Sequence, residues 1–298
     1  MDAAAINVVK SKKSSLSSFR QNIIVRRFLS NRMAVTGCIL LSLIFLMAVL
    51  APLLASQPPL QMKVTDRLKA PSAEHWFGTD EFGRDVYSRV LYGSRISMMV
   101  GLSVVVISSG LGLILGLYSA YYRRLDNLIM RVNDGLMAFP AILLAIAIMA
   151  ALGPKIENVI ISISVVYIPT VARTVRSAAI VVREQTYIEA IRALGGRSWR
   201  IIWFHIAPNC MSPLIIQATF IFAYAVIIEA SLSFLGAGTP PPQPSWGNIL
   251  SDGRTLMKQA WWIMVFPGIA IVMTVLGLNL IGDGLRDLLD PHTNKAKG

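Results

Sequence analysis

The chain is poor in charged residues, in histidine and in cysteine. Only 15% of its 298 residues are charged, whereas soluble domains carry about 25%, so an ordinary soluble fold is disfavoured. The three histidines, His75, His205 and His292, lie in separate loops, and Cys38 and Cys210 each stand alone. This spacing predicts neither a metal site nor a disulfide framework, and we expect both cysteines to pack in apolar surroundings.

The sequence also lacks the motifs of nucleotide and hydrolytic chemistry. It contains no GxxxxGK[ST] loop, the segment whose backbone amides cradle the phosphates of a nucleotide. We therefore expect the chain to bind no ATP by itself. Nothing in the order of serine, histidine and aspartate residues indicates a catalytic triad. The prediction is that the chain is not an enzyme alone and holds no cofactor or metal of its own.

Apolar residues, by contrast, are abundant: 54% of the chain is hydrophobic and the mean hydropathy is +0.59. A bilayer core about 30 Å thick is crossed by a helix of roughly 20 apolar residues. Six stretches are nearly free of charge: Met33–Leu54, Ile96–Tyr122, Gly135–Pro154, Asn158–Ala172, Ile206–Ile228 and Gln259–Gly282. The fourth is short unless Arg173 and Arg176 belong to its end and extend to the lipid headgroups. The sequence therefore predicts an all-α integral membrane protein with six transmembrane helices.

The basic residues orient these helices, because lysine and arginine collect on the cytoplasmic side of a membrane. Placing the N-terminus inside puts 19 of the 28 basic residues in the cytoplasm, so both termini are predicted to be cytoplasmic. The net charge of +12 and the pI of about 10.0 are then explained by topology. Nucleic-acid binding is disfavoured, because the charge is spread over loops rather than gathered on one face with stacking aromatics.

The chain divides into regions of distinct composition. Residues 1–32 form a basic tail, with an interfacial helix expected from about Phe19, and residues 33–55 form the first transmembrane helix, an uncleaved anchor. Residues 56–94 form an external loop. Residues 95–286 form a five-helix core that contains a cytoplasmic loop at 177–207, and residues 287–298 form a cytoplasmic tail. Glycines spaced GxxxG, Gly112 and Gly116, indicate close helix packing within the chain.

The most informative segment is the charged, amphipathic stretch at residues 187–209. A helix is predicted over Glu184–Leu194, and Gly195–Gly196 ends it because glycine tolerates a positive φ. A second helix is predicted over Arg197–Ile206, with Trp199, Ile202, Trp203 and Ile206 on one side. Pro208 suits the first turn of the next helix. Such a hairpin could lie in the membrane interface, pack on the chain's own helices, or enter a groove of a soluble partner.

Four blocks of sequence, in order, resemble a known family. Residues 187–209 resemble the cytoplasmic coupling loop of type I ABC importer permeases, with Glu189, Ala190, Gly195 and Pro208 in register and Ile191 replacing a consensus alanine. Residues 77–95, 231–254 and 282–291 are similar to the C-type permease subunit of dipeptide, oligopeptide and nickel importers. The resemblance implies that an ATP-binding subunit contacts these residues: Tyr187, Glu189, Ala190, Ala193, Gly195, Gly196, Trp199, Ile202, His205 and Pro208.

The resemblance also implies a set of partners in the bacterial cytoplasmic membrane. They are a sister permease, two ATP-binding subunits that hold ATP and Mg, and an extracytoplasmic solute-binding protein. The implied function is ATP-driven import of di- or oligopeptides, with nickel chelates, glutathione or opine-like solutes as alternatives. A membrane scaffold that only anchors a soluble protein is a further alternative.

The external loop carries a polar motif whose marked residues are Gly78, Asp80, Gly83, Arg84 and Asp85. One interpretation is a turn and short helix in which Asp80, Arg84 and Asp85 pair locally. The other is an external gate or interface that contacts the binding protein or the sister subunit. After the fifth helix, four prolines between residues 240 and 244 exclude a helix, and a short helix is predicted at Asn248–Lys258.

Glu229 is the one acidic residue deep in an apolar stretch. A charge there costs at least about 2.5–3.5 kcal/mol on insertion scales, so its side chain must face a polar interior or be protonated. We favour helix packing or lining of the path, with hydrogen bonds to Ser231, Ser233 or another helix. The alternative is a proton-coupled secondary transporter, although the sequence offers no relay of acids and no internal repeat.

Overall fold

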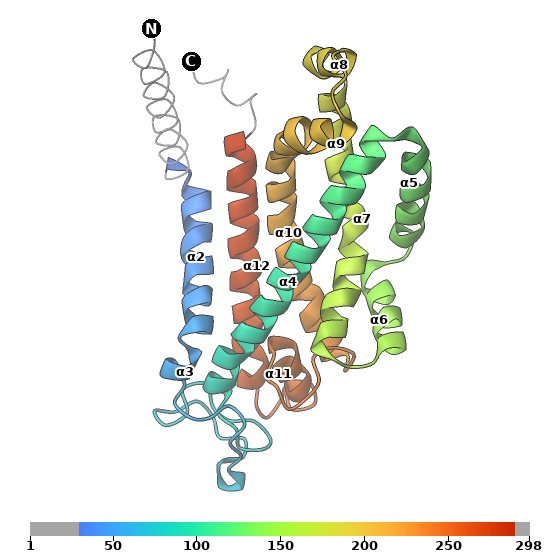
Figure 1. The fold of residues 1–298 in the computed structure, drawn as a ribbon. Coiled ribbons are helices and arrows are strands. Elements are labelled where there is room, and N and C mark those ends of the chain that lie inside the picture. Colours follow the sequence, from blue (N-terminus) through green and yellow to red (C-terminus); the bar gives the residue numbers. More distant parts are fainter. Residues whose placement is uncertain (1–29, 290–298) are drawn as a thin grey trace.

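The computed structural model describes residues 30–289, and the regular structure in that range is helical (Figure 1). Five of the described helices are long and apolar enough to cross a membrane. They are α2 (Arg32–Val49), α4 (Val86–Tyr121), α7 (Ile156–Arg183), α10 (Ala207–Phe234) and α12 (Trp262–Leu289). The predicted interfacial helix from Phe19 and the C-terminal tail lie outside the described residues.

The third predicted span is not one straight helix, which corrects the sequence-based expectation. It consists of α5 (Arg123–Met137) and α6 (Ala141–Leu152), two helices bent by 94° at a short break. Pro140 stands immediately before α6, and proline disfavours helical backbone in the residue that precedes it. If this bent pair counts as one crossing, the chain crosses a membrane six times.

The second span begins earlier than hydropathy predicts, at Val86 rather than near Ile96. Asp85 caps the helix by accepting from the Ser88 backbone amide at 2.8 Å, which satisfies a donor that would otherwise lack a partner. Arg89 and Ser94 in the first turns are buried among neighbouring loops. The predicted external loop is therefore shorter than residues 56–94, and the helical core starts ahead of residue 95.

Small residues allow the helices to approach closely. A side chain at Gly112 would place its Cβ 2.4 Å from the Cβ of Val171, and one at Gly116 would lie 2.7 Å from the carbonyl of Ala172. The GxxxG pair therefore packs α4 against α7, which confirms the intramolecular packing predicted from its spacing. The helix α2 lies at the edge of the bundle and packs on α12 (Figure 1).

The bundle has two distinct ends, which we call the α8 end and the α11 end (Figure 1). The α8 end holds α8 (Thr186–Ala193), α9 (Ser198–Arg200), the start of α2 and the end of α12. The α11 end holds α3 (Ala51–Leu54), a 3₁₀ turn at Val64–Asp66 and α11 (Trp246–Gly253). A helix is thus present near Asn248–Lys258, but it runs from Trp246 to Gly253, and the Ser245 side chain caps its start by accepting from the Asn248 amide.

Candidate functional site

The first candidate region is the hairpin at the α8 end. Ile188 is buried in the core and anchors α8, while Tyr187 and Glu189 beside it are exposed. Gly195 has a φ of +79°, and a Cβ there would meet no described atom within 4 Å. This glycine is therefore required by the backbone of the turn rather than by crowding. Leu194 next to it is 88% exposed, although the predicted apolar face of the helix included it.

The helix after the turn differs from the prediction. Residues Ile201–Ile206 form a π-helical segment that connects α9 to α10. Ile202 and Ile206 point into the core, but Trp199 and Trp203 are exposed, because the wider π turn rotates side chains off the α-helical spacing of three and four. Helical backbone runs without a break from Ser198 to Phe234. Pro208 therefore lies within a continuous helix beside the π segment, instead of opening a separate helix.

The hairpin is attached to the end of α4 as well as to α7 and α10. The Arg192 guanidinium lies 4.8 Å from the centre of the Tyr121 ring, and the Tyr121 hydroxyl is 3.3 Å from Ser198 Oγ. Arg183 donates to the carbonyl of Ala120 at 2.5 Å. These contacts connect the hairpin and the end of α7 to the end of α4, the helix that packs most extensively on α7.

The other predicted residues of the hairpin differ in accessibility. Ala190, Ala193 and Pro208 are exposed, whereas Gly196 and His205 are partly buried. Trp199 is 53% exposed and stacks edge-on with Phe204 at 5.7 Å between ring centres. Ile202 is buried, so it supports the hairpin from inside and is not available to a docked protein.

A polar cleft of about 520 Å³ lies between α5 and α7. Arg176 forms two hydrogen bonds to Asp126, at 2.5 and 2.6 Å, and Arg173 donates to Asp134 at 2.7 Å. From the sequence, the two arginines were expected to extend to the lipid headgroups, and the aspartates were not identified as their partners. Asp126 and Asp134 are eight residues apart and so share one face of a helix, which is the signal that could have identified them. Charged groups on spanning helices face protein or water rather than lipid.

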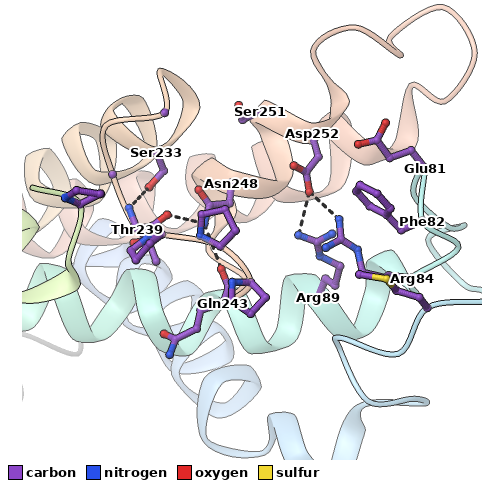
Figure 2. A pocket seen from close by; sticks show the side chains of 17 residues that line it. Glu81, Phe82, Arg84, Arg89, Ser233, Thr239, Gln243, Asn248, Ser251 and Asp252 are labelled. Carbon is purple, nitrogen blue, oxygen red and sulfur yellow. Dashed lines mark hydrogen bonds and ion pairs between the residues drawn. The ribbon is translucent and has the colours of Figure 1, made fainter.

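At the α11 end, the side chains of Asp80, Arg84, Arg89 and Asp252 form a paired cluster, and Figure 2 shows the two arginines with Asp252. Arg84 binds Asp80 at 2.6 Å and Asp252 at 3.0 Å. Arg89 on α4 binds the same two aspartates, with Asp252 at 3.0 Å. Two positive and two negative charges therefore balance in a site where three of the four side chains are buried. Sequence analysis missed Arg89 and Asp252, because only the fold brings α11 next to the start of α4.

The polar motif of the external loop is a turn without the predicted short helix. Gly83 has a φ of +70°, and a Cβ there would lie 1.8 Å from the carbonyl of Lys63; Gly78 also has a positive φ. Asp80 pairs locally with Arg84, as predicted. Asp85 does not: its Oδ1 lies 3.0 Å from His75 Nδ1, while its Oδ2 caps α4.

The charged cluster borders a cavity of about 620 Å³ (Figure 2). Its opposite wall is the proline-rich segment 240–243, which is non-helical, as its prolines predict. Asn248 of α11 donates to the carbonyls of Thr239 and Gln243 at 2.9 and 3.1 Å and holds this segment in place. Two sides of the cavity, the charged cluster and the proline-rich segment, are therefore held by side-chain contacts.

Glu229 is fully buried and lies at a junction of three segments. It accepts from Ser97 of α4 at 2.9 Å, from Ser233 of its own helix at 2.8 Å and from Thr239 at 3.2 Å. The predicted contacts to Ser233 and to another helix are confirmed. Ser231 instead donates to the backbone carbonyl of Ile227. The carboxyl group therefore joins α4, α10 and the proline-rich segment.

The loop at the α11 end also brings Asp66, Glu74 and His75 together, with their ligand atoms within 4.8 Å of one another. The scattered histidines of the sequence gave no indication of this group. Lys69 lies 2.6 Å from Asp66 Oδ1. Its ammonium lowers the pKa of the Asp66 carboxyl below the ordinary value, and the carboxylate in turn raises the pKa of Lys69.

Comparisons with known proteins agree with this arrangement of helices. Residues 110–295 match the family of binding-protein-dependent transport system inner membrane components. The chain belongs to this family. Residues 18–71 also match the N-terminal transmembrane domain of oligopeptide transport permease C, so the first helix, at the edge of the bundle, is a family feature as well.

Relatives of this transport family match nearly the whole chain. One relative, from Brucella abortus biovar 1, is provisionally named a peptide transport system permease protein. It is 54% identical to this chain over 90% of both chains. A dipeptide transport system permease protein of Alkalihalophilus pseudofirmus is 48% identical over 88% of this chain and 86% of its own. A glutathione transport system permease protein of Pectobacterium atrosepticum is 41% identical over 89% of both.

The fold of this family member is that of known ABC importer permeases. A solved chain of the MetNI methionine ABC transporter, in an inward-facing conformation, matches with a TM-score of 0.52 at 20% identity. The match covers 69% of this chain and 94% of that one. The protein is thus a multi-pass inner-membrane subunit, and its family membership implies ATP-binding subunits and a second permease as partners.

Proposed function

We propose that the chain forms half of a translocation path for di- or oligopeptides, driven by separate ATP-binding subunits. The relatives named for peptide and dipeptide transport support the substrate class. A relative at lower identity is named for glutathione, which is itself a peptide. Peptides carry an ammonium and a carboxylate group, and a path lined with both signs of charge suits them better than an apolar one.

In this proposal the α8 end faces the cytoplasm and the α11 end faces outward. The excess of basic residues in the N-terminal tail and in the loop after α7 supports this orientation. Both termini are then cytoplasmic. The cavity beside the Arg84–Asp252 pair would face the solute-binding protein, and Arg84, Asp80 and the turn at Gly83 would form an external gate or interface.

The observation that carries the proposal is the hairpin at the α8 end. It is anchored by one buried residue of α8, Ile188, and attached to α4 through Arg192 and Tyr121. At the same time it presents Tyr187, Glu189, Leu194 and Trp199 to solvent. Exposed apolar and charged side chains on a short helical hairpin are what a groove in a soluble protein can bind. We propose that an ATP-binding subunit supplies this groove.

The mechanism follows from these attachments. Closure of two ATP-binding subunits would move the hairpin, and the Arg192–Tyr121 and Arg183–Ala120 contacts would transmit the movement to α4. The α5–α7 cleft would then change its opening relative to the sister permease. The charged groups in that cleft, Asp126, Asp134, Arg173 and Arg176, would line the path on the cytoplasmic side.

The test is reconstitution of the chain in liposomes, with and without the sister permease and the ATP-binding subunits. Only the full set, supplied with ATP and binding protein, is expected to accumulate labelled dipeptides and tripeptides. Competition by glutathione, by an opine and by a nickel chelate would define the substrate class. Uptake by the chain alone, driven by a pH gradient without ATP, would instead support secondary transport through Glu229. A complex that assembles but takes up none of these solutes would indicate a scaffold.

A further inference from the structure

The loop at the α11 end contains a histidine with an unusual environment. His75 is 1% exposed, and its Nδ1 lies 3.0 Å from Asp85 Oδ1. Its Nε2 is buried and finds no hydrogen-bond partner among the described residues. Leaving a buried polar atom without a hydrogen bond is costly, so a native structure that keeps one requires an explanation, such as an ion.

The geometry fixes which nitrogen is free. A carboxylate can only accept hydrogen bonds, so beside the Asp85 carboxylate the proton of a neutral imidazole lies on Nδ1. The lone pair of Nε2 is then directed toward Asp66, whose Oδ2 lies 3.7 Å away. A carboxylate behind one histidine nitrogen and a free lone pair on the other is the arrangement that orients metal-binding histidines.

Two carboxylates complete a set of three ligands. Asp66 is nearly buried and Glu74 is exposed, and the ligand atoms of both lie within 4.8 Å of His75. Ligands held at about 2.0–2.2 Å from one zinc ion are at most about 4.4 Å apart. The three side chains therefore need to approach one another only slightly to hold one ion, and the exposed Glu74 leaves a path for an ion to enter.

The charges around the histidine favour a cation. Three carboxylates, those of Asp66, Glu74 and Asp85, surround one imidazole. Within the described structure, the cation in contact with Asp66 is Lys69, at 2.6 Å. The Lys69 side chain is 48% exposed and flexible, so it can leave when a doubly charged ion arrives.

We propose that His75, Asp66 and Glu74 bind a divalent transition-metal ion of the zinc type. Imidazole with carboxylate ligands suits such ions. The bound ion would join the 3₁₀ turn at Val64–Asp66 to the loop before α4. Because Asp85 both orients His75 and caps α4, the ion would also fix the start of the helix that crosses the bundle.

The experiment uses the full chain without an affinity tag, in its complex, after removal of metals with a chelator. Zn²⁺ is then added, and bound zinc and the melting temperature are measured. We expect one zinc per chain that raises the melting temperature, and Co²⁺ in its place should show the visible absorption of a cobalt ion bound by nitrogen and oxygen.

Variants distinguish this site from other histidines and acids of the chain. His75→Gln and Glu74→Gln should each weaken zinc binding by at least tenfold, and Glu74 is exposed, so its variant should fold. Lys69→Met should strengthen binding, because the competing ammonium is gone. Glu157→Gln, an exposed acid outside the group, should bind as the unmodified chain does. Absence of stoichiometric zinc, or binding unchanged by both Glu74→Gln and Lys69→Met, would overturn the proposal.

Discussion

The two charged regions of the molecule are built in opposite ways. In the cluster of Asp80, Arg84, Arg89 and Asp252, three side chains are buried and each arginine binds both aspartates. In the α5–α7 cleft, each arginine binds one aspartate, and the Arg173–Asp134 pair is exposed, with Asp134 at 63%. The first arrangement fixes one geometry, whereas the second can open into water or against another subunit. The α11 end is therefore suited to a rigid rim and the cleft to a changing path.

The largest effect is expected from removing one charge of the buried cluster. Asp80→Ala leaves two buried arginines short of a partner, and breaking a buried pair in this way costs about 3–5 kcal/mol. Asp134→Ala in the cleft should cost at most about 1 kcal/mol, because exposed pairs contribute little. The loss of stability in each variant is measured by thermal and denaturant unfolding of the purified complex. Equal losses of stability for the two variants would contradict the contrast between the regions.

Glu229 should behave as a structural junction of the rigid end. Glu229→Ala leaves three buried hydroxyls without their acceptor. Each hydroxyl that stays without a partner should lower the free energy of unfolding by about 1–3 kcal/mol. Glu229→Gln keeps an oxygen acceptor and the side-chain volume, so its stability and ATP-driven uptake should stay close to those of the unmodified chain. If Glu229→Gln abolished uptake without any change in stability, proton transfer through this residue would gain support.

The hairpin can be tested with two glycines that both have a positive φ. Gly195→Ala and Gly153→Ala force alanine into a φ of +79° and +85°, with open space around the Cβ. At Gly153 the ψ of 165° lies in a region that is essentially restricted to glycine, so this variant, outside the hairpin, should be the more strained of the two. Only the change at Gly195 should reduce uptake relative to ATP hydrolysis, because only that glycine lies at the proposed contact with an ATP-binding subunit. The measurement is the ratio of peptide transported to ATP hydrolysed. Equal ratios in both variants would argue against coupling through this turn.

The smallest change in stability is expected in the cleft, where function should respond instead. Arg173→Ala removes an exposed ion pair worth about 0–1 kcal/mol, yet it removes a charge from the proposed path. We expect slower uptake with an unchanged melting temperature. Lys155→Ala, an exposed charge in the loop between α6 and α7, is the matched control. Uptake that is unaffected by Arg173→Ala would place the path elsewhere.

Hydropathy and glycine spacing predicted much of this fold, and their errors have physical causes. The α2 and α12 spans and the Gly112–Gly116 contact follow from local composition, because a lipid environment requires long apolar helices. The early start of α4 was missed, since Arg89 and Ser94 look exposed until α11 and the loops cover them. The bend at Pro140 and the π segment at Ile201–Ile206 were missed as well, because hydropathy averages over residues and carries no information about the direction of the backbone.

The sequence by itself determined the membrane character of the chain, its family and the position of the hairpin, because these depend on residues that are close together along the chain. Only the tertiary structure decided which charges meet. Asp252 forms an ion pair with Arg89, which lies more than half of the sequence away. Arg176 of α7 forms an ion pair with Asp126 of α5, and the folding of a loop places His75 next to Asp66. Such contacts depend on how helices cross and loops return, and no local pattern of residues encodes that geometry.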